Sequence, residues 1–297
     1  MRVIIVKKQT LIIAAIVVVA LIAGIVILCV AAAKEDSSAP TMQYQKIEEY
    51  ELNVLAGKQR ELPVYYVERT DKAIALTIDA AWEDDKTAFI LDTLKQHDIK
   101  ATFFLCGVWV EAYPDQVKAI AAQGHEIGNH SLTHPHMNKL DAAAIQKEIS
   151  DLDDQIEALT GKRCTLFRAP YGEYNDIVIR AVRDIGYEPI QWNLDTIDWK
   201  QERSAEVILN TVLPKLTPGS IILCHNNGYR IKDYLPVLIE KATEQGYTFV
   251  TMTELLLHGE TTIDNNGMQK PAAPASAAPA SAMPEQSAPP AQTPKAA

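Results

Sequence analysis

Acidic, basic and imidazole side chains recur in this sequence at the points where short apolar runs end. Asp79 closes the run "LTID", and a lone carboxylate at such a place is costly to bury unless something pairs with it. His130 and His134 stand four residues apart, so a helix or a turn could bring their imidazoles together. Two converging imidazoles suit Zn, Co, Ni or Fe. These residues could therefore form a metal site that activates water.

Hydrolysis by an activated water also needs a base for its proton and an acid for the leaving group. Asp79 is the candidate base, and His225, which follows the apolar run "SIILC", is the candidate acid. Arg168 could pair with Asp79 and favour its ionised form, and Asp198 could pair with His225 and favour the imidazolium. Each pair alone could be a structural ion pair. Their common position at strand ends favours a functional site.

Two other histidines lie close to this pair in the sequence. His136 is a secondary candidate ligand, because Pro135 redirects the chain between it and His134. His125 begins an apolar run, and we expect it to be a structural histidine at the opposite end of the strands from the chemistry.

The residues that must position these groups alternate between short apolar runs and amphipathic stretches. This alternation predicts an α/β fold with a parallel sheet or barrel, and in such folds the chemistry collects at the carboxyl ends of the strands. Helix starts are predicted at Pro114 and after Asp141, Asn175 and Ser204. Helix ends are predicted at Gly124, Gly161, Gly186 and Gly246. The seven expected strands are 74–79, 101–106, 125–128, 166–168, 187–192, 220–224 and 248–251.

Residues 11–33 are uncharged and largely branched apolar, and about 20 such residues suffice to span a bilayer. Basic residues precede this run, so the positive-inside rule places the N-terminus in the cytoplasm and the rest of the chain outside. We therefore expect a single-pass protein of the cell membrane with an extracytoplasmic catalytic domain. One alternative is a secreted protein cleaved near Ala33, although the apolar run is long for a signal peptide. Another is a lipoprotein lipidated at Cys29.

The remaining chain divides into three parts by composition. Residues 34–65 are a polar juxtamembrane segment with a possible strand at "LPVYYVE", and residues 66–258 are the expected catalytic domain. Residues 259–297 are rich in Pro and Ala and are predicted to be a disordered tail.

The net charge and the cysteine spacing argue against nucleic-acid binding and against disulfide bonds. The 297 residues carry a formal net charge of -10, which argues against a nucleic-acid partner. Cys106, Cys164 and Cys224 show no paired spacing, so we expect buried free thiols rather than disulfides. No feature of the sequence indicates an oligomeric state.

Five stretches of the sequence resemble the ordered motifs of the polysaccharide deacetylase (NodB homology) family, carbohydrate esterase family four. They are "LTIDAAW", "HSLTH", "RAPYG", "DTIDW" and "LCH", and they span about residues 70–257. The resemblance is closest to the membrane-anchored or sporulation-type subgroup. It implies a distorted (β/α)7 barrel and removal of acetyl groups from N- or O-acetylated sugars with a divalent metal, zinc first among Zn, Co, Ni, Mn and Fe.

The resemblance also implies a role for each matching residue. Asp79 matches the base, Arg168 the residue that holds it, and His225 the acid that Asp198 tunes. His130 and His134 match the metal ligands. The backbone N–H of Tyr171 matches the donor to the oxyanion, Trp199 an aromatic wall of the substrate groove, and Leu223 the wall of the acetyl-methyl pocket.

Ala80 departs from the family pattern, because the usual motif has a second aspartate that ligates the metal at this position. The expected function is deacetylation of an N-acetylated cell-wall glycan such as peptidoglycan or a chitin-like polymer. The metal is expected to be held by His130, His134 and waters, with Asp79 as a further candidate ligand. The alternatives are a glycan-binding protein that has lost catalysis and an O-acetyl polysaccharide esterase.

Overall fold

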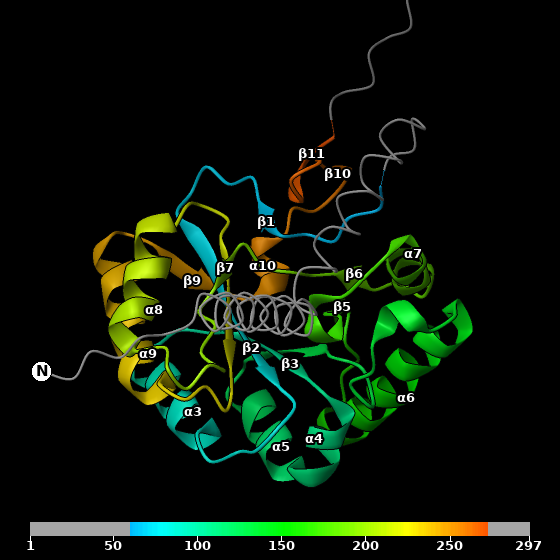
Figure 1. Cartoon of the computed structure of the whole chain (residues 1–297), viewed down its shortest axis with the longest axis horizontal. Coiled ribbons are helices and arrows are strands. Elements are labelled where there is room, and N and C mark those ends of the chain that lie inside the picture. The colour runs from blue at the N-terminus through cyan, green and yellow to red at the C-terminus, as the bar shows by residue number, and fades with distance from the viewer. Residues whose placement is uncertain (1–59, 273–297) are drawn as a thin grey trace, which may run out of the picture. The chain divides into compact units, whose positions relative to one another are not determined.

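Parallel strands curl through the centre of the protein, and helices cover their outer side (Figure 1). The structure is a computed structural model that describes residues 60–272. The main sheet has eight strands, and each of its strand pairs is parallel. They are β2 (Ala73–Ala80), β3 (Thr102–Leu105), β4 (Glu126–Asn129), β5 (Leu166–Phe167), β6 (Glu188–Pro189), β7 (Leu194–Asp195), β8 (Ile221–His225) and β9 (Thr248–Val250).

The sheet does not close on itself by direct strand pairing. Its order is β6-β5-β4-β3-β2-β8-β7, with β9 paired to β2, so β6 and β7 are its edges. The chain before β2 spans these edges, because Val64 bridges to Ile190 after β6 while Tyr66 bridges to Ser220 before β8. This curled parallel sheet confirms the predicted α/β class. The sheet forms an open half-barrel, which is consistent with the predicted (β/α)7 fold.

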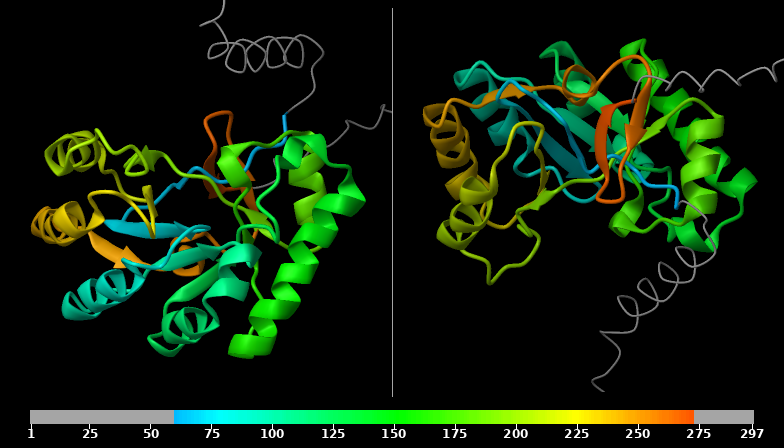
Figure 2. Two further views of the ribbon diagram at one scale, coloured as in Figure 1. Left: turned by 60° about the horizontal axis from the view of Figure 1, so that its bottom comes forward. Right: turned by 90° about the horizontal axis from the view of Figure 1, so that it is seen from above.

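The helices form a layer around the outer side of the sheet, as the turned views show (Figure 2). The predicted caps at Asp141, Asn175 and Ser204 are confirmed, since each side chain accepts a hydrogen bond from the first turn. Gly161 ends the longest of these helices in the left-handed conformation, with φ 73°. The helices are α3 (Thr87–Gln96), α4 (Gly107–Ala112), α5 (Pro114–Ala122), α6 (Ala142–Thr160), α7 (Asp176–Asp184), α8 (Ala205–Val212), α9 (Ile231–Glu244) and α10 (Met252–Leu255). Short 3₁₀ turns are η1 (Met137–Lys139), η2 (Pro170–Gly172) and η3 (Leu213–Lys215).

Each of the seven predicted apolar runs contains a strand, but β7 was missed. Leu194–Asp195 is only two residues long, too short to show the alternation that identifies a strand. Its place is set by β8, where Leu194 pairs with Ile222 and Asp195 with Leu223. The fifth predicted run, 187–192, was too long, since only Glu188–Pro189 is a strand.

The prediction of a disordered tail from residue 259 is wrong for its first part. Thr261–Ile263 (β10) and Met268–Pro271 (β11) form an antiparallel hairpin, and β11 also pairs in parallel with β1 (Tyr66–Val67). The turn is held by Asp264, whose Oδ1 accepts the backbone N–H groups of Asn266 and Met268. The folded unit therefore extends past the predicted domain end at 258.

The predicted membrane segment 11–33 and residues 273–297 lie outside the described residues. Among residues 60–272, no helix has the length and apolar character needed to cross a bilayer. The expectation for the described cysteines is confirmed, because Cys106, Cys164 and Cys224 are buried free thiols.

Candidate active site

The candidate base and the candidate acid lie on neighbouring strands. β2 and β8 pair in parallel so that Thr77 is opposite Leu223 and Asp79 is opposite His225. Because side chains alternate along a strand, these four residues share one face of the sheet. The order of strands thus brings together two groups that are far apart in the sequence.

Arg168 clamps the Asp79 carboxylate. Its Nη1 donates to Asp79 Oδ1 at 2.7 Å and to the Thr77 hydroxyl at 2.9 Å, while Nη2 donates to the Gln191 carbonyl at 3.1 Å. The guanidinium is fully buried and lies over the Phe104 ring, with its carbon 4.1 Å from the ring centre. The ion pair expected from the sequence is therefore present, and it fixes one carboxylate oxygen.

Two opposing effects act on the pKa of Asp79. Burial would raise it, but the positive charge of Arg168 and the nearby imidazoles outweigh burial, so the pKa of Asp79 lies below its ordinary value. Asp79 is consequently ionised at neutral pH and can accept a proton.

His130 and His134 are brought together by a tight turn rather than by a helix. Asn129 anchors the start of the turn, because its amide donates to the Ile149 carbonyl and its Oδ1 accepts the Ser131 N–H. The Ser131 hydroxyl in turn accepts the backbone N–H of His134, which has a positive φ of 57°. The two imidazole rings meet edge to face with centres 5.0 Å apart.

Both imidazoles fit a divalent metal. His130 Nδ1 lies 2.8 Å from the Arg168 carbonyl, so it is the protonated nitrogen. Nε2 therefore keeps a free lone pair for a metal and lies 3.7 Å from Asp79 Oδ2. His134 Nδ1 is buried and has no hydrogen-bond partner within the described residues. Burial lowers the pKa of both rings, to about 4 for His134, so both are neutral and able to ligate. Residues 60–272 contain no cluster of three or more His, Cys, Asp and Glu side chains spaced as a metal site.

His225 is the end of a buried hydrogen-bonded chain. Its Nδ1 lies 2.8 Å from Asp198 Oδ1, and its backbone N–H donates to Asp198 Oδ2 at 3.1 Å. The Tyr234 hydroxyl donates to the same Oδ2 at 2.6 Å. Burial would lower the pKa of His225, but the hydrogen bond and charge of Asp198 outweigh it, and the pKa is raised. His225 can therefore hold a proton for donation.

We expect activity to fall with rising pH as His225 loses its proton. Because the pKa of His225 is raised from 6.5, the alkaline half-point should lie above pH 6.5. Asp198→Asn removes the negative charge that raises this pKa, so it should move the half-point to lower pH. The measurement is kcat/KM against pH for both proteins, and an unmoved alkaline limb would contradict the assignment of His225.

Tyr234→Phe is expected to shift the same limb in the other direction. Without the hydroxyl, the Asp198 carboxylate is less stabilised and holds the His225 proton more tightly, so the half-point should rise. The lost hydrogen bond to a charged group should also lower the free energy of unfolding by about 1.5–3 kcal/mol. Tyr247→Phe, which removes the hydrogen bond to the Leu216 carbonyl, is the matched control and should leave the pH profile unchanged.

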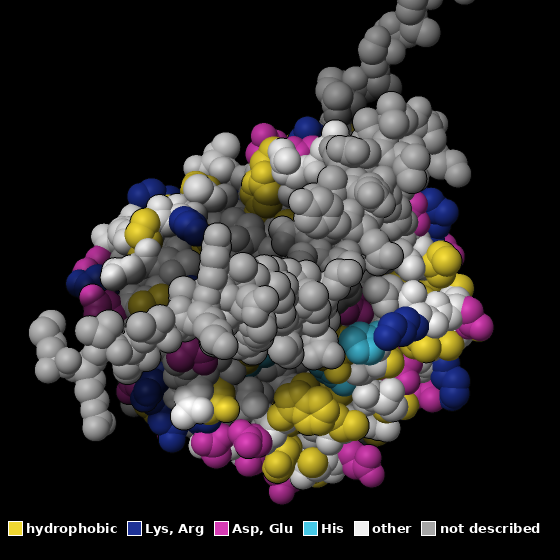
Figure 3. All heavy atoms as spheres, in the orientation of Figure 1, with side chains coloured by type: hydrophobic (Ala, Val, Ile, Leu, Met, Phe, Trp, Pro, Cys, Tyr) yellow, Lys and Arg dark blue, Asp and Glu magenta, His cyan; other side chains and the backbone are white. Residues whose placement is uncertain are grey.

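The three predicted substrate contacts lie around this centre. Tyr171 adopts a positive φ of 58° in the turn η2, and its ring meets the His134 ring edge to face with centres 4.6 Å apart. Trp199 is exposed beside Asp198, and Leu223 is buried between the Thr77 and Asp195 positions of the neighbouring strands. Their roles as oxyanion donor, groove wall and pocket wall stay predictions. Figure 3 shows histidine side chains next to apolar side chains on the face turned to the viewer.

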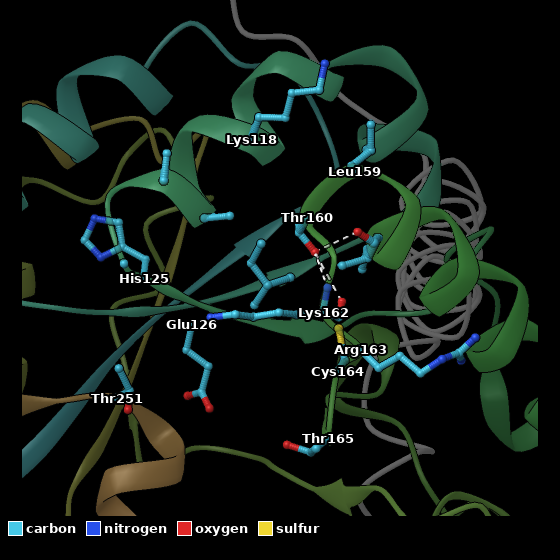
Figure 4. Close-up of a pocket in the computed structure, with 15 residues that line it drawn as sticks. Lys118, His125, Glu126, Leu159, Thr160, Lys162, Arg163, Cys164, Thr165 and Thr251 are labelled. Atoms are coloured by element: carbon cyan, nitrogen blue, oxygen red, sulfur yellow. Dashed lines mark hydrogen bonds between the residues drawn. The ribbon is translucent and has the colours of Figure 1, made fainter.

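His136 and His125, the two histidines near His130 and His134 in the sequence, have other partners. His136 Nδ1 pairs with Glu173 at 2.8 Å, and its ring stacks on Tyr171. His125 lines a cavity of about 590 Å³ at the amino ends of β4 and β5, where Figure 4 shows its ring on the opposite side from Arg163. Its Nδ1 accepts the Ala101 N–H at 3.3 Å. As expected, His125 lies at the opposite end of the strands from Asp79.

The described chain is similar to known deacetylases over most of its length. It is 31% identical over 214 residues to the peptidoglycan-N-acetylmuramic acid deacetylase PdaA of Bacillus subtilis (strain 168), which covers 69% of this chain and 81% of that protein. The family model described as polysaccharide deacetylase matches residues 66–190. The chain belongs to the polysaccharide deacetylase family.

Other members of the family are described either as deacetylases or as a pseudoenzyme. A peptidoglycan-N-acetylglucosamine deacetylase of Bacillus cereus is 37% identical over 186 residues, covering 61% of this chain and 67% of that protein. A solved structure from Bacillus anthracis, described as a pseudoenzyme of the CE4 family, is 38% identical with a TM-score of 0.62, covering 65% of this chain and 68% of that one. The family thus contains both named deacetylases and a protein described as a pseudoenzyme.

Ala80, the residue that departs from the family motif, lies inside the hydrophobic core. The Ala80 side chain is fully buried and belongs to the same apolar cluster as Ile78 and Leu105. The Ala80 carbonyl accepts the Cys106 N–H at 2.9 Å, which fixes the backbone at the end of β2. A methyl group therefore occupies the position where the family motif has a charged ligand.

Several residues of the site were not found from the sequence. Thr77 and Gln191 hold Arg168, and Tyr234 holds Asp198, but each is a common residue type without a distinctive spacing. One available signal was that Thr77 stands two residues before Asp79 and so shares its face of the strand.

Proposed function

We propose that this protein removes acetyl groups hydrolytically from an N-acetylated cell-wall polysaccharide, peptidoglycan or a chitin-like polymer, and releases acetate. The observation that carries the proposal is the pairing of Asp79 and His225 on adjacent strands with pKa values shifted in opposite directions. A base and an acid are thereby ready at the same pH, beside two imidazoles with free nitrogens. The names of the relatives support the choice of substrate class.

The residues divide the reaction between them. A divalent metal held by His130 and His134, zinc first among the candidates, would polarise the acetyl carbonyl and lower the pKa of water when bound. Asp79 takes the proton of the attacking water while Arg168 keeps the carboxylate oriented. His225 then gives its proton to the nitrogen of the leaving amine. The products are acetate and a free amino sugar.

Two further residues shape the acyl site in this proposal. The backbone N–H of Tyr171 donates to the carbonyl oxygen as negative charge develops on it, an interaction worth about 3 kcal/mol in comparable sites. Leu223 lies on the same face as His225 and forms the wall against the acetyl methyl group.

The location of the reaction is also a proposal. Residues 11–33 would anchor the chain in the cell membrane with its N-terminus in the cytoplasm, so that the catalytic domain meets the wall outside. Support comes from the length and apolar character of this segment alone.

A second candidate function is glycan binding without catalysis. Ala80 removes a ligand that the family motif supplies, and a solved relative of 38% identity is described as a pseudoenzyme. The metal would then be held too weakly for turnover while the glycan surface remained.

The test is acetate release by the full chain in detergent, with Zn, Co or Mn added. The substrates are peptidoglycan, N-acetylglucosamine oligomers and O-acetylated xylan. Metal-dependent acetate from an N-acetylated substrate is the expected result. Acetate from xylan alone would make the protein an esterase, and peptidoglycan binding without acetate under any metal would establish the second candidate.

A further inference from the structure

The turn η2 has an unfavourable backbone conformation at the residue whose N–H the proposed function uses. Tyr171 has a φ of 58° and Gly172 a φ of 66°, so two successive residues are in the left-handed region. This conformation is costly for a bulky residue and persists only where the surrounding structure holds it. Within the turn, the Gly172 N–H donates to the Ala169 carbonyl and the Glu173 N–H to the Pro170 carbonyl. The position of the Tyr171 N–H therefore also depends on what holds this turn from outside.

Gln191 holds η2 from the neighbouring strand. It follows β6, which lies beside β5 in the sheet (Figure 1). Its side-chain Nε2 donates to the Gly172 carbonyl at 3.2 Å. Trp192 packs on the same glycine, because a Cβ there would lie 3.0 Å from the end of the indole ring. Gln191 is only 3% exposed, so few water molecules compete with its amide for this hydrogen bond.

The backbone of Gln191 supports the candidate base at the same time. Its carbonyl accepts Arg168 Nη2 at 3.1 Å, and Arg168 Nη1 donates to the Asp79 carboxylate. Its N–H donates to the Val64 carbonyl at 2.7 Å, in the segment that spans the open edges of the sheet. Gln191 thus joins three parts of the protein, which are the segment before β2, the clamp on the base and the turn with the oxyanion donor.

We propose that Gln191 is a positioning residue of the active site, which fixes the Tyr171 N–H relative to the Asp79 carboxylate. It acts through Gly172 and Arg168 rather than on the substrate. The N–H must lie about 2.7–3.1 Å from the developing oxyanion while the carboxylate reaches the attacking water, so the two groups need a fixed separation. A misplacement of about 1 Å costs about 10²-fold in rate. This inference rests on the proposed function for the role of the Tyr171 N–H.

The test compares two glutamine substitutions in the full-length protein in detergent with zinc. Gln191→Met keeps the length of the side chain but removes the donor to the Gly172 carbonyl. Gln146→Met is the matched control, because Gln146 Nε2 donates to the Ala181 carbonyl at the same 3.2 Å, between α6 and α7. With an N-acetylglucosamine oligomer, Gln191→Met should lower kcat about 10- to 100-fold at an almost unchanged KM, since the oxyanion forms only in the transition state. Gln146→Met should leave kcat unchanged.

A second measurement needs no turnover. Hydrogen exchange is followed by mass spectrometry in peptides that contain the Gly172 and Glu173 amides, whose hydrogen bonds define η2. Exchange there should be faster in Gln191→Met and unchanged in Gln146→Met, because only the first substitution releases the turn. Gln191→Asn keeps the amide but is one methylene shorter. It is the milder variant, and it should show the same faster exchange if Gln191→Met does not fold.

The outcomes separate this inference from the proposed function. Equal loss of kcat in Gln191→Met and Gln146→Met, or unchanged exchange at η2 in both Gln191 variants, overturns the positioning role. A raised KM with an unchanged kcat also overturns it, because the loss then lies in substrate binding. Faster exchange at η2 together with a lower kcat supports it. If the natural protein releases no acetate from any substrate, the proposed function fails, and faster exchange confined to η2 still supports the hold of Gln191 on the turn.

Discussion

Asp79→Asn should reduce the rate of acetate release by about 10²- to 10⁴-fold, the range that a positioned general base contributes. The amide has nearly the same shape as the carboxylate but cannot accept the proton of water. It can still accept a hydrogen bond from Arg168, so the geometry of the site should persist while its chemistry is lost. The measurement is kcat with a defined N-acetylated oligomer.

The same substitution should also destabilise the fold, because it leaves the Arg168 guanidinium buried without its counter-charge. Breaking a buried ion pair from one side costs about 3–5 kcal/mol. Asp153→Asn is the matched control, since Asp153 is a fully buried carboxylate paired with Arg163 at 2.9 Å on the α6 side of the protein. The control should lose stability without a comparable loss of kcat. If Asp79→Asn retains activity, Asp79 is not the base.

Position on a strand was the part of the site that could be predicted from the sequence. Asp79, Arg168 and His225 each follow an apolar run, and parallel strands bring their carboxyl ends to one edge. The N-caps of α6, α7 and α8 could also be predicted from the sequence, because each depends only on one side chain and on the first turn of the helix that follows it.

Pairings between distant segments could not be predicted in the same way. That β2 lies between β3 and β8, and so places Asp79 opposite His225, follows from the strand order of the whole sheet. The hairpin at 261–271 was missed because β1, the strand that pairs with β11, lies just over two hundred residues earlier in the chain.

Ala80→Asp should tighten zinc binding by at least about 10- to 100-fold, because a direct ligand should contribute no less than the hydrogen-bonded partners of ligands, whose loss costs that much. The reason is chemical: His130 and His134 are two neutral ligands, and catalytic zinc sites have three protein ligands. The measurement is zinc affinity by competition with a chelator, with Ala80→Asn as the uncharged control of the same size. Ala81→Asp, which adds the same charge one residue further along, is the positional control.

Ala80→Asp should lower the stability of the metal-free protein but increase the stabilisation that zinc provides. The Ala80 side chain is fully buried, so a carboxylate there has a desolvation cost in metal-free protein and should lower its melting temperature. Zinc should then raise the melting temperature more in the variant than in the natural protein, because tighter binding to the folded state adds stability. If zinc affinity does not change, position 80 does not reach the metal and the two histidines define the site alone. If acetate release occurs only in the Ala80→Asp protein, the natural chain is not itself a deacetylase, and the second candidate function is favoured. If the natural protein already releases acetate and the variant does so at lower zinc, Ala80 sets the metal affinity of a working deacetylase.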